Sequence, residues 1–210
     1  MTQTTTRIAP SVGRPWSAYA AATWCGLFAI RGVYWALGGT VGLSTLSAGI
    51  REAHDAGDPY LFAALWITVV LEVIGVGLAL SLARAGGSFP DWVPFLRGRT
   101  LPIWLPVLPA FGAGGLLVGH GALFCSFGLR AASGAFEVTS EVLWYSLFWG
   151  PWFMTGGILF ALAASGYVAR FSEPGTRHRR LGVLAAVTGV ILGLIAAAAP
   201  FVVSALASGT

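Results

Sequence analysis

The chain has little charge and no lysine. Only 10% of its 210 residues are charged, whereas a soluble domain averages about 25%. All twelve basic residues other than histidine are arginine, and 56% of the residues are hydrophobic. So few charges cannot cover a water-facing surface. The composition therefore excludes an ordinary soluble domain and predicts a polytopic membrane protein whose length suits one compact bundle.

Motifs for catalysis and metal binding are missing as well. The chain contains no His-Glu-x-x-His, no Gly-x-Ser-x-Gly, no P-loop and no Asp-rich diphosphate motif. This weighs against zincin-type proteases, ATP-driven pumps and magnesium-dependent prenyltransferases. The two cysteines, Cys25 and Cys125, lie in different apolar runs at different predicted depths, so we expect no disulfide. Without zinc-type spacings we expect neither a metal site nor a cofactor.

Five long apolar runs follow a polar tail of residues 1–16. They cover approximately residues 17–40, 61–83, 101–127, 142–169 and 181–207. Each run is long enough to cross a bilayer. We expect the first to stay uncleaved, because it is too long for a signal-peptide core and no polar cleavage region follows it. The predicted fold class is all-α: one transmembrane helical bundle of five spans, residues 17–207.

Arginines lie mainly on one side of these runs. The N-terminal tail, the second loop and the fourth loop carry nine of them, including Arg84 and Arg170 at the run ends, whereas the first and third loops carry two. The positive-inside rule then predicts a cytoplasmic N-terminus and an external C-terminus, in a bacterial cytoplasmic membrane. Because the arginines flank apolar runs and form no basic groove, we expect the lipid bilayer as partner and no nucleic acid.

A carboxylate lies at the middle of the second run. Glu72 is the only ionisable residue of residues 61–83, and a charge at that depth is costly and needs a partner. Residues three or four positions apart share a helix face. The residues that share the face of Glu72 are Leu65, Thr68, Gly75 and Ala79. This stripe, which is small and polar around the carboxylate, predicts that Glu72 points into the bundle.

Arg31 of the first run is the expected partner of Glu72. A rise of about 1.5 Å per residue places Arg31 and Glu72 at similar depths, with His120 of the third run near them. We therefore predict a buried Arg31–Glu72 ion pair beside His120, at the centre of a small pocket. The alternative is a purely structural ion pair that sets the helix register.

Aromatic and polar side chains are expected to line this pocket. Trp35 follows Arg31 by four residues, within reach of a cation–π contact. The predicted binding residues are Arg31, Tyr34, Trp35, Thr68, Trp149 and Trp152. Glu72 and His120 are the candidate catalytic residues.

The first loop carries two further patterns. Its apolar residues have helical spacing, which predicts a short helix on the membrane surface; these are Leu43, Leu46 and Ile50, with Ser47. His54 with its acidic neighbours resembles a metal-ligand cluster, although a solvated outer loop is the simpler interpretation. Asp58 and Pro59 predict the start of the next helix, as N-cap and first helical residue.

Prolines and glycines predict local features of the last three runs. Pro102, Pro106 and Pro109 open the third run, so its first turns are expected to be irregular, and Pro151 should kink the fourth. Glycines four residues apart, which permit close helix packing, occur in the third and fifth runs. These pairs are Gly115 with Gly119 and Gly189 with Gly193.

Two segments carry distinctive aromatic and glycine patterns. Residues 28–42 contain Tyr-Trp-Ala-Leu-Gly-Gly-Thr at 34–40, and residues 147–164 contain Trp-Gly-Pro-Trp at 149–152 followed by a Gly-Gly pair. Both segments resemble a family of small bacterial multi-pass membrane proteins known only as a domain of unknown function. That family often has an aspartate before the Pro-Trp, where this chain has Gly150. The resemblance implies the multi-pass topology and no activity.

Three functions stay open at this point. The pocket could bind or transport a small or lipid-like molecule. Alternatively, the protein could be a membrane-embedded enzyme of the isoprenoid (terpene) cyclase or isomerase type, with Glu72 as general acid and tryptophan faces stabilising a carbocation. As a third hypothesis, it could be a structural or accessory subunit whose glycine-rich third and fifth spans pack on a partner. The sequence does not indicate the substrate or the oligomeric state.

Overall fold

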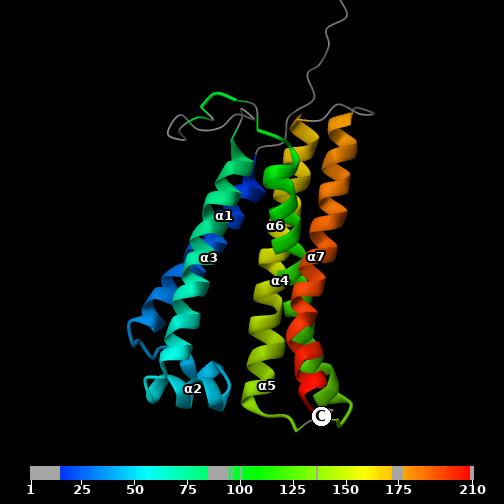
Figure 1. The fold of residues 1–210 in the computed structure, drawn as a ribbon. Coiled ribbons are helices and arrows are strands. Elements are labelled where there is room, and N and C mark those ends of the chain that lie inside the picture. Colours follow the sequence, from blue (N-terminus) through cyan, green and yellow to red (C-terminus); the bar gives the residue numbers. More distant parts are fainter. Residues whose placement is uncertain are drawn as a thin grey trace, which may run out of the picture.

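A computed structural model of the chain describes residues 15–84, 95, 97–99, 101–135, 137–171 and 177–208. The described residues form helices and no strands, which confirms the predicted all-α class (Figure 1). In chain order the elements are α1 (Trp16–Ala36), the 3-10 helix η1 (Leu43–Thr45), α2 (Ala48–Asp55), α3 (Pro59–Ala83), α4 (Trp104–Ala132), α5 (Ser140–Trp144), the π-helix η2 (Tyr145–Trp149), α6 (Gly150–Phe171) and α7 (Arg177–Ser208).

Four helical segments are long and apolar enough to cross a membrane. They are Pro59–Ala83, Trp104–Ala132, Ser140–Arg170 and Arg179–Ala198. They correspond to the second to fifth apolar runs, so the expected membrane-protein class agrees with the structure. Helix α1 has 21 residues but does not belong to this set. A fifth span at α1 therefore stays a prediction.

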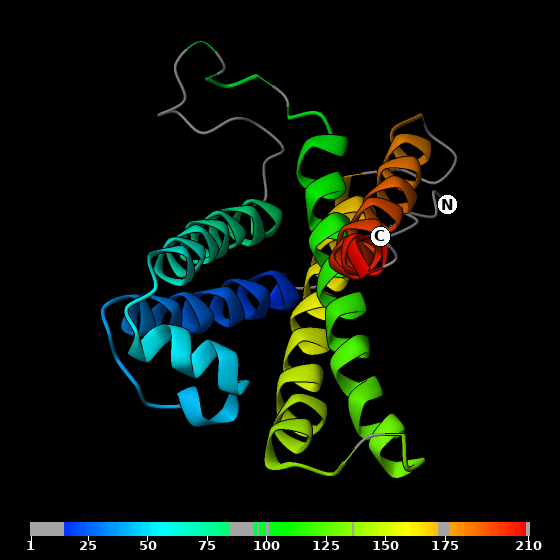
Figure 2. The same cartoon turned by 60° about the horizontal axis from the view of Figure 1, so that its bottom comes forward.

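The long helices form two groups that meet along α1 and α6. Helix α1 packs along α3, and α4 packs along both α6 and α7. Successive long helices run in alternating directions, so α2, α5 and the C-terminal end of α7 lie at one end of the molecule (Figure 1). At that end the two groups diverge, and Figure 2 shows that the α1–α3 pair crosses the α4–α6–α7 group.

Glycines bring α4 and α7 into backbone contact. A Cβ atom added at Gly115 would lie 2.7 Å from the carbonyl oxygen of Val190, and one at Gly119 would lie 3.0 Å from the Cβ of Ala197. Added Cβ atoms at Gly189 and Gly193 would likewise collide with the α4 backbone. The predicted close packing of both glycine pairs is confirmed. The glycine face of α4 packs directly against the glycine face of α7.

Two consecutive glycines let α6 pack against both groups. Gly156 leaves room for the indole of Trp24 on α1, which would lie 2.6 Å from an added Cβ atom. Gly157 faces the other way, where an added Cβ would lie 2.7 Å from the carbonyl oxygen of Gly114 on α4. Trp24 also donates its indole N–H to the carbonyl of Trp152 at 3.1 Å. Helix α6 is therefore the joint between the two helix groups.

The ends of α1 and α3 follow from their capping residues. Helix α1 ends at Ala36, earlier than the predicted residue 40, because Gly38 takes a left-handed conformation with φ of 89°. Arg31 therefore lies only about 8 Å from the end of its helix, nearer the membrane boundary than predicted. At the start of α3, Asp58 accepts a hydrogen bond from the Tyr60 amide at 2.8 Å, which confirms the predicted N-cap.

Prolines have different effects in the third and fourth runs. Residues 101–103 precede the helix, and α4 is helical from Trp104 onward, with Pro106 in the first turn where its missing N–H needs no partner. The irregularity predicted there is thus confined to the residues before the helix. The distortion expected at Pro151 takes the form of η2, a π-helical turn directly before it.

Matched glycine substitutions test the α4–α7 packing. We expect Gly115→Ala to lower the free energy of unfolding by about 1–3 kcal/mol, because the new methyl group overlaps the α7 backbone. Gly77→Ala is the control, since a Cβ at that exposed α3 position meets no atom within 4 Å. Because alanine has a higher helix propensity than glycine, this control should leave the free energy of unfolding unchanged or raise it by up to about 1 kcal/mol. Equal midpoints for the two variants in SDS-titration unfolding would contradict this packing.

Candidate functional site

A short helical segment occupies the diverging end of the two helix groups. We call η1, α2 and their connection, residues 43–55, the cap segment. Its apolar side chains Leu43, Leu46 and Ile50 face a cavity inside the protein. The predicted helix is present, and its apolar face packs on the bundle. The prediction of an amphipathic helix was correct, and the surface that its apolar face covers is that of the protein itself.

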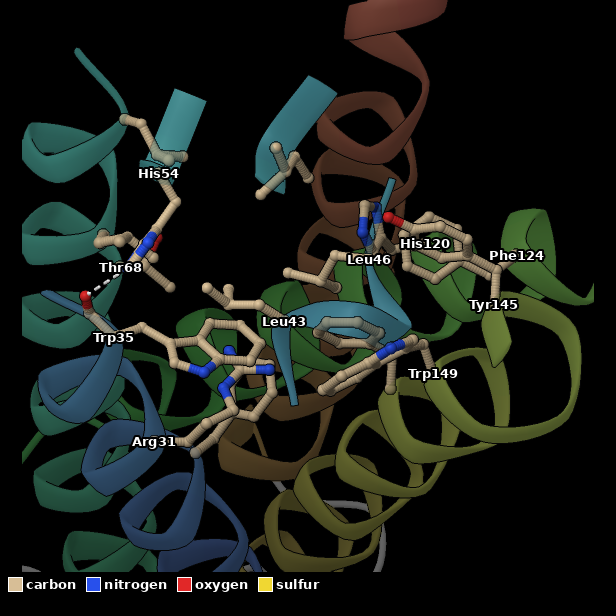
Figure 3. A pocket seen from close by; sticks show the side chains of 15 residues that line it. Arg31, Trp35, Leu43, Leu46, His54, Thr68, His120, Phe124, Tyr145 and Trp149 are labelled. Atoms are coloured by element: carbon tan, nitrogen blue, oxygen red, sulfur yellow. Dashed lines mark hydrogen bonds between the residues drawn. The ribbon is translucent and has the colours of Figure 1, made fainter. Parts of the chain in front are cut away.

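The cavity has a volume of about 350 Å³ and draws its walls from both helix groups. Most of its lining is apolar or aromatic, and the polar or charged lining residues are Arg31, His54, Thr68, His120 and Tyr145. Figure 3 shows His54, Thr68 and Trp35 on one side, His120, Phe124 and Tyr145 on the other, and Leu43 and Leu46 between them. No aspartate or glutamate is among the described residues that line it.

Hydrogen bonds fix the cap segment to α1. The ring Nε2 of His54 lies 3.2 Å from the carbonyl oxygen of Trp35, and only 7% of the His54 side chain is exposed. The indole N–H of Trp35 donates to the carbonyl of Val41 at 2.8 Å, just before the cap segment. The interpretation of His54 as part of a solvated loop was therefore wrong, because its ring is buried against the C-terminal end of α1.

Other hydrogen bonds fix the cap segment to η2. The amide of Ser47 donates to the hydroxyl of Tyr145 at 3.2 Å. The indole N–H of Trp149 donates to the hydroxyl of Thr45, also at 3.2 Å. Both helix groups thus hold the segment from opposite sides, and the cavity is closed at this end by a fixed element.

Arg31 lies at the inner end of the cavity among aromatic rings. Its Cζ atom is 3.5 Å from the ring centroid of Phe28, 4.3 Å from that of Trp35 and 5.0 Å from that of Trp149. The predicted cation–π contact with Trp35 is confirmed. The buried Nε of Arg31 has no hydrogen-bond acceptor among the described residues. The aromatic faces stabilise the cation, but the buried Nε–H of the guanidinium is left without any described acceptor.

Glu72 lies elsewhere, in the interface between α1 and α3. Its oxygen Oε2 would be 3.4 Å from a Cβ atom added at Gly32, and Gly75, one turn further on, faces Cys25. The stripe prediction was correct in that Glu72 is buried, with 7% exposed. Both carboxylate oxygens lack a hydrogen-bond partner within the described part of the chain. The predicted Arg31–Glu72 ion pair is therefore not formed as a direct contact, although the two groups are close enough to interact electrostatically.

The other predicted site residues divide into two sets. Trp35, Thr68, Trp149 and His120 line the cavity together with Arg31. The imidazole of His120 packs against Phe124 and Phe153, with ring centroids at 4.4 and 5.0 Å. Tyr34 is 42% exposed, and its hydroxyl accepts a hydrogen bond from Val41 outside the cavity. Trp152 stacks on Trp24 at 5.6 Å and is likewise outside the cavity lining.

Sequence reasoning missed the contribution of the cap segment and of η2. His54 follows Ile50 by four residues, so extending the apolar pattern of the loop by one turn would have found it. Tyr145 and Phe153, in the aromatic first part of the fourth run, were not among the predicted binding residues. As for metals, no group of three His, Cys, Asp or Glu side chains in the described ranges could hold an ion.

Comparisons of the chain with family models, with curated proteins and with solved structures found no match. The resemblance to the family of unknown function therefore stays a prediction. The structure does explain Gly150, the position where that family often has an aspartate. A Cβ atom there would lie 2.6 Å from Sγ of Cys125 and 3.0 Å from the carbonyl oxygen of Gly121 on α4. Close packing of α4 on α6 thus requires glycine in this chain.

Removal of the His54 ring tests how the cap segment is held. We expect His54→Ala to lower the free energy of unfolding by about 1–3 kcal/mol, because it deletes a buried ring and its hydrogen bond to the Trp35 carbonyl. Glu52→Ala, on the exposed side of α2, is the control and should change stability by less than about 0.5 kcal/mol. SDS-titration unfolding measures both. Indistinguishable curves would show that His54 is solvated.

Proposed function

We propose that this protein binds or transports a small or lipid-like molecule, which occupies the cavity beneath the cap segment. One observation supports this most directly: a charged guanidinium lies in a mainly aromatic cavity, and its buried Nε–H has no acceptor among the described residues. A cation in such surroundings is costly unless a partner satisfies it. Cavities of this size with few convergent polar groups are typical of ligand sites.

The enzyme hypothesis is less well supported by the geometry. A general acid must lie within hydrogen-bond reach of the group that it protonates. Glu72 is outside the cavity lining and faces α1 across Gly32. His120 does line the cavity, so an isomerase or cyclase would have to use this histidine. Binding requires no such reassignment, and we therefore prefer it.

The accessory-subunit hypothesis has lost its main support. It depended on glycine-rich faces of the third and fifth runs that would be free to pack on a partner. In the structure these faces of α4 and α7 pack on each other. An accessory role would now need another surface.

We also propose five spans, with α1 as the first, in a bacterial cytoplasmic membrane. The alternating directions of the long helices support this arrangement (Figure 1). Arg84, Arg170 and the start of α7 lie at the end opposite the cap segment, and the arginine bias would make that end cytoplasmic. The cap segment and its cavity would then lie near the external surface.

Epitope tags at the two ends test this topology. We expect an antibody to reach a C-terminal tag in intact spheroplasts, and an N-terminal tag only after permeabilisation, because an odd number of spans separates the ends. If α1 does not cross the membrane, both tags should be accessible without permeabilisation. A cytoplasmic protein detected in parallel verifies that the spheroplasts are intact.

A bulky side chain in the cavity tests the binding function. We expect Thr68→Trp to reduce the amount of co-purifying ligand about tenfold, because Thr68 lies on the exposed side of the lining, where an indole would fill space that the ligand needs. Ile67→Trp, at the adjacent exposed position outside the lining, is the matched control. Mass spectrometry of extracts from protein in native-lipid nanodiscs measures the ligand. Identical extracts from wild type and both variants would contradict a ligand in this cavity.

A further inference from the structure

We propose that the ligand of this cavity has one acidic headgroup, a carboxylate or a phosphate monoester, on a single hydrocarbon chain, and that Arg31 binds the acid. The inference rests on the proposed binding function and adds the chemical class of the ligand.

The surroundings of the Arg31 guanidinium indicate that the ligand has an acidic headgroup. A distance of 3.5 Å from Cζ to the Phe28 centroid is a stacking distance, so the flat face of the guanidinium lies on the ring. Stacking occupies the face and leaves the N–H groups at the edge, where a carboxylate or phosphate binds in the plane with two parallel hydrogen bonds. Nε is buried without an acceptor among the described residues, and no described acidic residue lines the cavity. An acidic ligand would supply the missing acceptor, and its charge would add to the electrostatic interaction that Arg31 already has with Glu72.

The remaining polar groups indicate that the ligand carries a single polar headgroup. The Thr68 hydroxyl donates to the carbonyl of Ala64 at 2.9 Å, within its own helix. The indole N–H groups of Trp35 and Trp149 donate to the Val41 carbonyl and to Thr45, as described above. A sugar or a peptide would bury several polar groups and need several partners. Besides Arg31, the cavity offers the imidazole of His120 and the hydroxyl proton of Tyr145, since His54 is already bonded to the Trp35 carbonyl.

The rest of the lining suits a hydrocarbon chain. Leucine and isoleucine side chains of the cap segment and of α3 cover the cavity beyond Arg31, and aromatic rings of α4 and α6 close the opposite side. The volume of about 350 Å³ is near the lower limit of ligand sites. One hydrocarbon chain of moderate length fits a cavity of this volume.

Competition among ligands with the same chain tests the headgroup. The full-length protein in nanodiscs is incubated with radiolabelled dodecanoate, and unlabelled dodecanoate, dodecyl phosphate, dodecanol or dodecyltrimethylammonium competes for the site. Empty nanodiscs give the amount of probe dissolved in lipid. We expect both acids to compete at least about tenfold more effectively than the alcohol and the cation, because only the acids can accept charge-assisted hydrogen bonds from Arg31. The stronger of the two acids identifies the headgroup.

Variants then assign the effect to Arg31. Arg31→Gln should weaken dodecanoate binding about tenfold or more and bring it to the level of dodecanol, whereas dodecanol itself should be little affected. Arg31→Lys should retain part of the preference, since it keeps the charge but loses the planar fork. Arg84→Gln, at the exposed C-cap of α3, removes an equal charge far from the cavity and should bind like wild type.

The failures of the two proposals are distinguishable. Equal competition by the alcohol and the acids in the wild-type protein would overturn the acidic headgroup and leave the binding function intact, and this comparison requires no variant to fold. Stronger competition by dodecyltrimethylammonium would overturn it as well. If no labelled dodecanoate binds beyond the empty nanodiscs and none of the other three ligands shifts the thermal unfolding of the protein, the proposed binding function fails.

Discussion

The stacking of the Arg31 guanidinium on aromatic rings is the interaction on which the cavity depends. The rings come from both helix groups, Phe28 and Trp35 from α1 and Trp149 from η2. Cation–π attraction partly replaces the water that the charge has lost. It supplies no hydrogen-bond acceptor, however, and an unsatisfied charged donor is unfavourable in a low-dielectric interior. Arg31 thus contacts rings of both helix groups at the cavity, and its buried Nε–H still lacks an acceptor among the residues that the structure describes.

The distances between neighbouring helices differ widely around this cavity. Glycines bring the α4, α6 and α7 backbones into contact, with Gly115 against Val190 and Gly157 against Gly114 as examples. Large aromatic side chains separate α1 from α6, where Trp24 stacks on Trp152 and Phe28 meets Phe153 edge to face. Close packing on one side and wide spacing on the other make the two groups diverge, as Figures 1 and 2 show. The space that results is covered by the cap segment.

Arg31 and Glu72 illustrate the limit of depth as a predictor of contact. Both residues are buried or half-buried, and their similar depth followed from a constant rise per residue. Contact also depends on direction around the helix. Arg31 points with Phe28 and Trp35 toward α6, whereas its neighbour Gly32 faces α3, where it leaves room for Glu72. One helical step of about 100° therefore separates the direction of Arg31 from that of Gly32 and Glu72. Only helix packing decides which neighbouring helix each direction meets.

The sequence by itself determined the membrane class, the apolar runs and the caps, because length, hydropathy and Asp58–Pro59 act locally. It also identified Arg31, Trp35, Thr68, His120 and Trp149 as pocket residues, since ionisable groups within apolar runs mark sites and tryptophans near them can form the walls. It could not show that the cap segment folds over the cavity or that Glu72 lies outside it. Those features depend on contacts between residues far apart in the chain, such as Ser47 with Tyr145. Only the tertiary structure brings such pairs together, and it does so through packing that no local pattern encodes.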